Sequence, residues 1–269
     1  MKSLNNLKIT LQPILHTIYL NSTLQIQKFV IFALINLLLL IIMNFIFYAL
    51  GLVSFLPYSL ATFYQNGSQY LILLIVLEVC FFFSGMICSE FKNKTGLTII
   101  PLISKNKLLL GKYIGNLLLV IGLTGVHYIT IVFLGYYLYG GVIISSILIS
   151  FGFAVLFVLA LSSIVTFLSS FMKSVNPIII IIIGLFLFGF SIIEAFMRTI
   201  APEFEPLYSL LYMSNIIRYS LFPNFTSMDR VTSFGQWLFP TVEGALIMML
   251  IYTVIFFTLA NQLFKRRGF

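Results

Sequence analysis

The sequence predicts an all-α polytopic membrane protein with six transmembrane helices, and three observations support this fold class. Six long apolar runs make up most of the chain, and only 8% of its residues are charged. Soluble domains carry about 25% charged residues, so this composition excludes a water-soluble protein. Lys and Arg gather in alternate connections between the runs, as in chains that cross a membrane back and forth.

Each apolar run is long enough to cross a bilayer. The hydrocarbon core is about 30 Å thick, and a helix needs roughly 20 apolar residues to cross it. A span in lipid must satisfy its backbone hydrogen bonds internally, so we expect helices. The expected spans are residues 29–50, 70–88, 113–138, 142–168, 178–196 and 242–264, within a single membrane domain of residues 1–269.

The segment before the first span, residues 1–28, has the pattern of a helix that lies on the membrane surface. Its apolar residues recur at helical spacing of three and four. They are Leu4, Leu7, Leu11, Ile14, Leu15 and Ile18. Pro13 is expected to bend or divide this helix. A frayed polar tail is the alternative interpretation.

The distribution of basic residues predicts the orientation. Twelve of the fifteen Lys and Arg residues lie in the N-terminal segment, the second-to-third connection, the fourth-to-fifth connection and the C-terminal tail. The positive-inside rule therefore places both termini in the cytoplasm of a cell-membrane protein. The net charge of +8 is then a topology signal beside anionic membrane lipid, and we expect no nucleic-acid partner.

The connection between spans two and three, residues 89–112, is the longest one on the cytoplasmic side. Its second half mixes apolar residues such as Ile99, Ile100 and Leu102 with Lys105 and Lys107. An amphipathic segment of this kind rests on lipid headgroups or docks on a protein partner, and both interpretations stay open. Immediately after it, Gly111 and Gly115 stand four residues apart, a spacing that lets membrane helices approach closely.

The largest external element is the connection of residues 197–241, between spans five and six. It carries Glu203, Glu205 and Asp229 together with the three external arginines. Its amphipathic stretch, residues 207–218, is too short to span a membrane. We expect short helices here that dip into the outer leaflet.

Glu78 is the clearest functional signal inside a span, since it lies in the middle of an apolar run. A charge at the bilayer centre costs about 2.5–3.5 kcal/mol, so this side chain should face the bundle, a cavity or a partner subunit. It is either a pathway or gating carboxylate or a hydrogen-bonded structural group. His127 is the other polar residue of this kind, and packing is the favoured interpretation over a ligand role.

The sequence lacks the patterns of a catalytic, metal or nucleotide site. Two isolated histidines, with Cys80 and Cys88 on another span, do not form a metal-site motif. Gly111-Lys112 is followed by Tyr113, and Asn106 stands where a phosphate-binding loop needs its first glycine. Any ATP-driven work must therefore use a second polypeptide.

The layout resembles the permease subunit of a type-2 ABC transporter. That family has six spans, both ends inside, an N-terminal interfacial helix, a coupling helix between spans two and three, and external helices between spans five and six. Residues 103–112, Ile-Ser-Lys-Asn-Lys-Leu-Leu-Leu-Gly-Lys, are similar to the family's Pro-Ile-Ser-Arg-x-x-Ile-Leu-x-Gly-Lys stretch. The proline falls one position early, at Pro101. Glu90 resembles the family's acidic residue after span two, and residues 263–269 resemble its Phe-x-Arg-Arg-x-Phe ending.

The resemblance implies an ATP-driven exporter in which the chain is not an enzyme by itself. Two permease copies, as a homodimer or with a close paralogue, form the pathway, and two copies of a separate ABC ATP-binding subunit hold ATP and Mg. The implied coupling residues are Glu90, Ile99, Ile100, Pro101, Leu102, Ile103, Ser104, Lys105, Lys107 and Leu108. Spans one, two and five line the family's pathway, and Glu78 is hypothesised to face it.

Two functions of other classes remain as alternatives. One is a membrane assembly or anchor protein that works without ATP, and the other is a membrane-embedded enzyme acting on lipid or peptide. No residue selects among drugs, peptides, lipids, glycans and ions as cargo.

Overall fold

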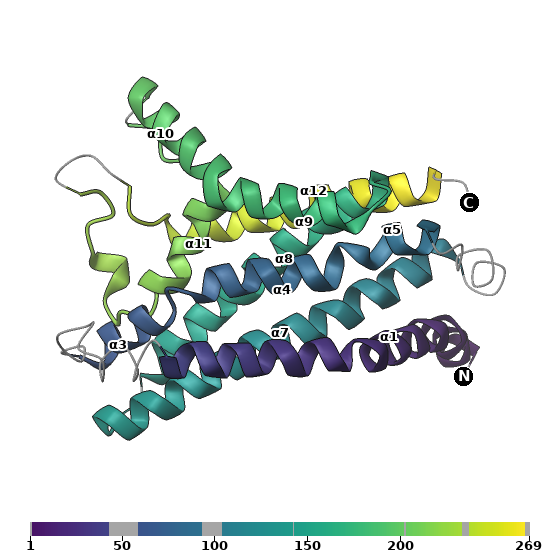
Figure 1. Cartoon of the computed structure of the whole chain (residues 1–269), viewed down its shortest axis with the longest axis horizontal. Coiled ribbons are helices and arrows are strands. Elements are labelled where there is room, and N and C mark those ends of the chain that lie inside the picture. The colour runs from purple at the N-terminus through teal and green to yellow at the C-terminus, as the bar shows by residue number, and fades with distance from the viewer. Residues whose placement is uncertain are drawn as a thin grey trace.

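The computed structural model describes residues 2–42, 59–92, 104–141, 143–201, 203–232 and 237–266. Within these ranges the regular structure is helical, apart from an isolated bridge between Val231 and Trp237. The long helices run side by side along one axis (Figure 1). The first helix begins and the last helix ends at the same end of the bundle, as six crossings require.

The predicted number of spans is confirmed. Six segments of the described chain are long and apolar enough to cross a membrane. They are Gln12–Ile41, Leu60–Ser89, Lys105–Tyr139, Ile144–Phe171, Val175–Ile200 and Val242–Arg266. The end of the first predicted span, residues 43–50, and residue 142 at the start of the fourth lie outside the described residues.

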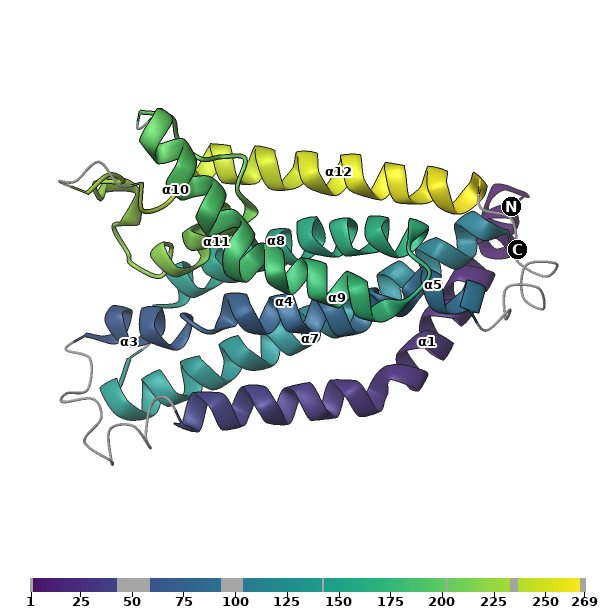
Figure 2. The same ribbon diagram turned by 45° about the horizontal axis from the view of Figure 1, so that its top comes forward.

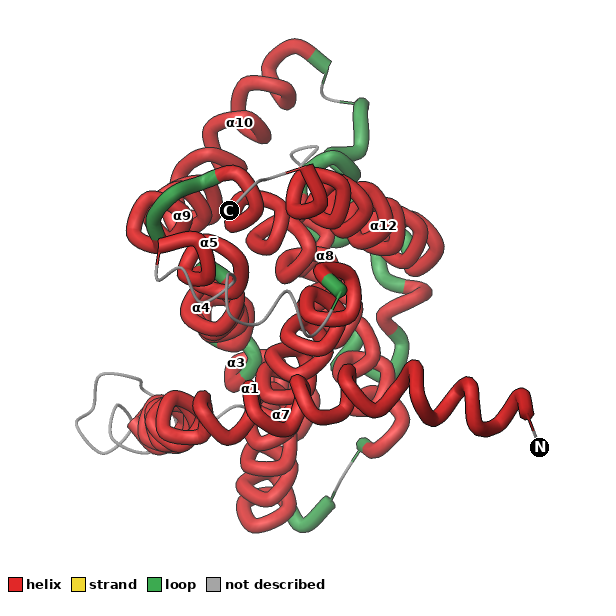
Figure 3. Tube along the Cα trace, turned by 90° about the vertical axis from the view of Figure 1, so that its right-hand side faces the viewer, coloured by secondary structure: helices red, strands yellow, loops and turns green. Residues whose placement is uncertain are grey.

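Helix α1, Lys2–Ile41, joins the predicted surface segment to the first span without a break. The helix continues through Pro13, so this proline does not divide it, and of the two expected outcomes only a bend remains. The N-terminal part of α1 nevertheless lies across the bundle axis while the rest runs along it (Figures 2 and 3). A bend of this kind agrees with an interfacial segment followed by a span.

The second span differs from the continuous helix predicted over residues 70–88. Helix α4, Leu71–Phe83, is followed by a separate helix α5, Gly85–Lys92, and a further helix α3, Leu60–Gly67, precedes both. The break falls at Ser84. There the Ser169 hydroxyl donates to the Ser84 carbonyl (2.8 Å) and accepts from Ile87 N–H (3.1 Å). A side chain from another helix therefore satisfies the backbone groups that the break releases.

The third and fourth spans form the expected hairpin. Helix α7, Lys105–Tyr139, ends at Gly140, whose φ of 68° is in the left-handed region that glycine adopts without strain. Helix α8, Ile144–Phe171, follows. Helix α7 begins at Lys105, before the predicted start of the span at residue 113, and so includes the last part of the predicted cytoplasmic connection.

The fifth span consists of α9, Val175–Gly184, the π-helical turn η2, Leu185–Gly189, and α10, Phe190–Ile200, in direct succession. Helix α10 leans away from the other helices (Figure 1). It continues past residue 196, where the span was predicted to end. The sixth span is α12, Val242–Arg266.

The connection that is predicted to be external contains the short helix α11, Leu210–Tyr219, and the turn η3, Phe225–Ser227. A short helix was expected here, but α11 does not lie free on the surface. Its apolar face, with Leu210, Met213 and Ile217, is fully buried against α8 and α12.

Packing is uneven among the spans. Helix α12 packs along α8, and α1 packs along α7. The segment from α3 to α5 is the most buried of the candidate spans, whereas α1, α9–α10 and α12 expose most of their apolar surface. The outer helices therefore present broad apolar faces to the membrane or to other membrane helices.

Candidate functional site

The described members of the implied coupling set lie at the end of the bundle where the first helix begins. Glu90 belongs to α5, and Ile99, Ile100, Pro101, Leu102 and Ile103 lie outside the described residues. Ser104 is exposed directly before α7, while Lys105 and Lys107 are half-buried on its first turns. Leu108 is buried, so this coupling residue faces the bundle.

Helix α7 connects this end of the molecule directly to the membrane interior. It runs unbroken from Lys105 to Tyr139. The Lys105 Nζ also donates to the main-chain carbonyl of Lys265 (3.4 Å), which ties the start of α7 to the end of α12. The start of α7 is therefore joined to the third span without a break in the helix.

The approach of α1 to α7 depends on the two glycines singled out in the sequence. A Cβ added at Gly111 would lie 2.8 Å from the Cβ of Thr17 and 3.2 Å from the carbonyl oxygen of Ile14. One added at Gly115 would lie 3.4 Å from the Ile18 carbonyl oxygen. The predicted close approach of helices at this pair is confirmed, and the partner is α1.

Inside the bundle, Glu78 is part of a hydrogen-bonded cluster that joins three spans. Asn36 of α1 donates through Nδ2 to Glu78 Oε1 of α4 at 2.7 Å. The Oδ1 of Asn36 lies 3.2 Å from His127 Nδ1 of α7. All three side chains are 1% exposed. We call this group the Asn36–Glu78–His127 cluster.

The geometry of the cluster assigns its donors. The amide oxygen of Asn36 only accepts hydrogen bonds, so His127 Nδ1 carries a hydrogen and donates to it. The amide nitrogen of Asn36 has two hydrogens, which serve Glu78 Oε1 and the Phe32 carbonyl (3.3 Å). The second carboxylate oxygen of Glu78, Oε2, has no partner among the described residues.

The cluster brings together Glu78 and His127, which the sequence analysis considered one by one. Asn36 was missed as its central member, although an asparagine within the apolar run of residues 29–43 was a usable signal. In this arrangement Glu78 is buried toward spans one and three. That geometry favours the structural interpretation of Glu78, while its role in a pathway stays a prediction.

A second set of polar contacts joins the same helices nearer the coupling end. Asn21 Nδ2 donates to Asn116 Oδ1 at 2.6 Å, and Asn116 Nδ2 donates to the Phe82 carbonyl at 2.7 Å. Tyr113 OH lies 2.9 Å from the Ser162 hydroxyl of α8. Side-chain hydrogen bonds thus stabilise the contacts between these helices and help to fix how the helices face one another.

At the opposite end of the bundle, an ion pair and its neighbouring contacts stabilise the connection that is predicted to be external. Arg230 Nη1 and Glu205 Oε1 form an ion pair at 2.9 Å, and the Arg230 guanidinium lies 5.4 Å from the centre of the Trp237 ring. The Tyr212 hydroxyl donates to the same Glu205 oxygen at 3.1 Å. Burial, followed by the neighbouring Glu205 charge, raises the pKa of Tyr212 above its ordinary value, so the hydroxyl remains a donor.

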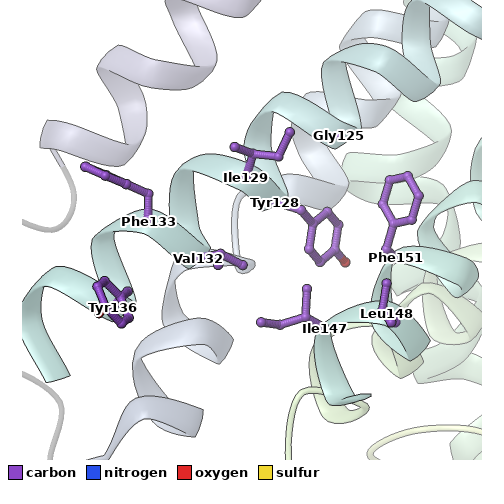
Figure 4. A pocket seen from close by; sticks show the side chains of 9 residues that line it. All are labelled: Gly125, Tyr128, Ile129, Val132, Phe133, Tyr136, Ile147, Leu148 and Phe151. Carbon is purple, nitrogen blue, oxygen red and sulfur yellow. The ribbon is translucent and has the colours of Figure 1, made fainter. Parts of the chain in front are cut away.

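The bundle has an apolar hollow of about 600 Å³ between α7 and α8 (Figure 4). Gly125 leaves part of its wall open, and aromatic and aliphatic side chains such as Phe133 and Phe151 form the rest. The Tyr128 hydroxyl contacts the Ser150 hydroxyl at 2.6 Å and is therefore already occupied. Across the described residues, no three His, Cys, Asp or Glu side chains gather as metal ligands do.

Comparison with known proteins identifies the family. Residues 85–269 match the family described as ABC-2 family transporter protein, which covers more than half of the chain and begins at the first residue of α5. No curated protein matches the chain. His127 lies within the matched region, and Asn36 and Glu78 precede it. The six apolar helices and this match agree that the chain belongs to the ABC-2 transporter family, as a membrane-spanning permease subunit.

Proposed function

We propose that this permease subunit works in an ATP-driven exporter of the cell membrane. It pairs with a second copy or a close paralogue to form the pathway. Two copies of a separate ABC ATP-binding subunit, which hold ATP and Mg, supply the energy. Both termini and residues 89–112 face the cytoplasm.

The observation that carries this proposal is the continuity of α7 from the coupling connection into the membrane. Lys105, Lys107 and Ser104 stand at the start of a helix that reaches His127 and the buried cluster without a break. A partner that moves residues 99–104 would shift this helix. By contrast, α4 is separated from the same connection by the break at Ser84.

Co-purification tests the partnership. The permease is expressed with a candidate ABC ATP-binding subunit, and the variant has residues 99–103 scrambled. This choice leaves Leu108 and the rest of α7 intact, and a matched control replaces exposed Asn224 and Thr226 at the opposite end. We expect the scrambled variant alone to lose the complex and its permease-dependent ATP hydrolysis.

A complex that survives the scrambling would refute the coupling assignment. Failure of the intact permease to bind any ATP-binding subunit would refute the exporter and favour an anchor protein or an intramembrane enzyme.

Cysteine labelling in intact cells tests the orientation. Both native cysteines are buried, so an impermeant thiol reagent reports on an introduced cysteine. Asn93→Cys should stay unlabelled until the cells are opened, whereas Asn224→Cys should react at once. Labelling of Asn93→Cys in intact cells would reverse the proposed sidedness.

The pathway role of Glu78 has its own test. Glu78→Gln keeps the shape of the side chain and retains an oxygen that can accept from Asn36. Altered export or altered ATP turnover by a complex of normal stability would support the pathway hypothesis. Unchanged export would assign Glu78 to helix packing.

A further inference from the structure

A polar cavity of about 410 Å³ opens at the lysine-rich end of the bundle, among α1, the α4–α5 break, α7 and the start of α9. Its volume is in the range of ligand sites. Polar side chains form part of its wall, whereas the wall of the hollow between α7 and α8 is apolar. The side chains that form this wall include Gln25, Lys28, Ser84, Lys112, Asn116 and Asn176.

The described part of the cavity wall is positively charged. Lys28 of α1 and Lys112 of α7 both line it, and among the described residues of its wall none is acidic. Two ammonium groups beside one cavity attract an anion. The helix α9 adds to this potential, because its first residues, Val175 and Asn176, also line the cavity.

At the start of α9, Val175 and Asn176 have backbone N–H groups, whereas Pro177 has none. Ser174 precedes the helix but does not cap it with its side chain. The N–H groups of a first helical turn carry partial positive charge and bind phosphate and other anions.

An independent observation at the break in the second span points to a ligand. Ser84 is 1% exposed and lines the cavity, yet its hydroxyl has no hydrogen-bond partner among the described residues. Buried polar groups are nearly always bonded, so this hydroxyl, which can donate to an anion, indicates a missing partner in the cavity.

We propose that this cavity binds a phosphate group, held by Lys28 and Lys112, by the Ser84 hydroxyl and by the start of α9. The rest of the wall favours a lipid headgroup over a soluble phosphate, because Phe81, which is 45% exposed, and Ile179 offer an apolar surface beside the polar one. None of the residues that line the cavity belongs to the implied coupling set, and the proposed binding needs neither ATP nor a partner subunit. Its test is therefore independent of the proposed function.

The first experiment measures retained lipid by native mass spectrometry of the purified full chain. The probes are phosphatidylglycerol, which is anionic, and phosphatidylcholine, which has no net charge. We expect the protein to retain phosphatidylglycerol preferentially. Lys28→Gln and Lys112→Gln should each reduce that retention about fivefold, the effect of one basic residue beside an anionic lipid. Ser84→Ala should give a smaller reduction.

The matched control is Lys265→Gln, which removes one exposed charge at the same end of the bundle but outside the cavity. Lys28→Arg keeps the charge and should retain the lipid. Equal retention of the two lipids, or equal losses in Lys28→Gln and Lys265→Gln, would overturn the site. Melting temperatures of the variants separate loss of binding from loss of folding.

Competition distinguishes the two sources of phosphate. Inorganic phosphate and glycerol phosphate are added to the protein loaded with phosphatidylglycerol. Retention of the lipid supports headgroup recognition assisted by the apolar wall. Displacement that requires Lys28 and Lys112 supports the same anion site with a soluble phosphate as its ligand. Displacement that is as efficient in Lys28→Gln and Lys112→Gln as in the parent protein would refute the anion site.

Discussion

The contact between α1 and α7 supports a graded prediction about stability. Gly111→Ala places a methyl group 2.8 Å from the Cβ of Thr17 and 3.2 Å from the main-chain oxygen of Ile14. Thr17 is β-branched, and its hydroxyl donates to the Pro13 carbonyl at 2.8 Å, so rotation away would break that bond. The overlap must therefore move α1 itself, at a cost of about 1–3 kcal/mol.

Alanine substitutions at two other glycines provide a reference for the destabilisation expected from Gly111→Ala. Gly115→Ala meets main-chain oxygen only at 3.4 Å and should cost less than Gly111→Ala. Gly125→Ala meets nothing within 4 Å, so it should be neutral or stabilising by about 0.5–1 kcal/mol through helix propensity. All three substitutions share that propensity gain, and the difference between Gly111→Ala and Gly125→Ala therefore isolates the overlap.

The native cysteines provide the assay. Cys80 and Cys88 are buried thiols that are at most 1% exposed, so a thiol-reactive dye reports their exposure on heating in detergent. A change of 1 kcal/mol shifts the melting temperature by about 2–4 °C in a chain of this size. We expect Gly111→Ala to melt lowest, then Gly115→Ala, then Gly125→Ala. Equal melting of Gly111→Ala and Gly125→Ala would refute the claimed contact.

Three further changes test other contacts. Asn36→Leu removes the amide that joins three spans and should cost about 1–3 kcal/mol, measured by the same dye assay; unchanged melting would show that the cluster adds no stability. Ser169→Ala leaves the break at Ser84 without its bridging hydroxyl, so the Ile87 amide should exchange its hydrogen faster, while amides in the middle of α8 serve as the control. Glu205→Gln removes the ion pair with a partly exposed arginine and should cost at most about 1 kcal/mol. Limited proteolysis of the external connection would measure this loss, and protection equal to that of the parent would contradict it.

Much of the fold was predictable because a bilayer imposes one simple condition on a chain. The hydropathy runs reported the number of spans, and most of their ends agree with the helices within a few residues. The start of α7 was misplaced because Lys105, Lys107 and Lys112 lower the local hydropathy without interrupting the helix. Charge marks the membrane boundary, whereas the hydrogen bonds of a helix continue past it.

The candidate sites were less predictable because they depend on neighbours. Glu78 was recognised as unusual from its own apolar run, but nothing in the chain order identifies Asn36 and His127 as its neighbours. The break at Ser84 was also missed. Ser84 and Gly85 lie in a run of high hydropathy, and the break is stabilised by Ser169, which is distant in sequence.

The amino-acid order alone determined that this chain crosses a membrane six times, which ends carry its lysines, and where glycines permit close helix approach. Those properties follow from local transfer energies and side-chain size. Only the tertiary structure decided which polar groups meet, how a broken helix recovers its hydrogen bonds, and where a positive cavity forms. Such features arise from side chains on different helices, and their pairing depends on how the helices rotate and cross.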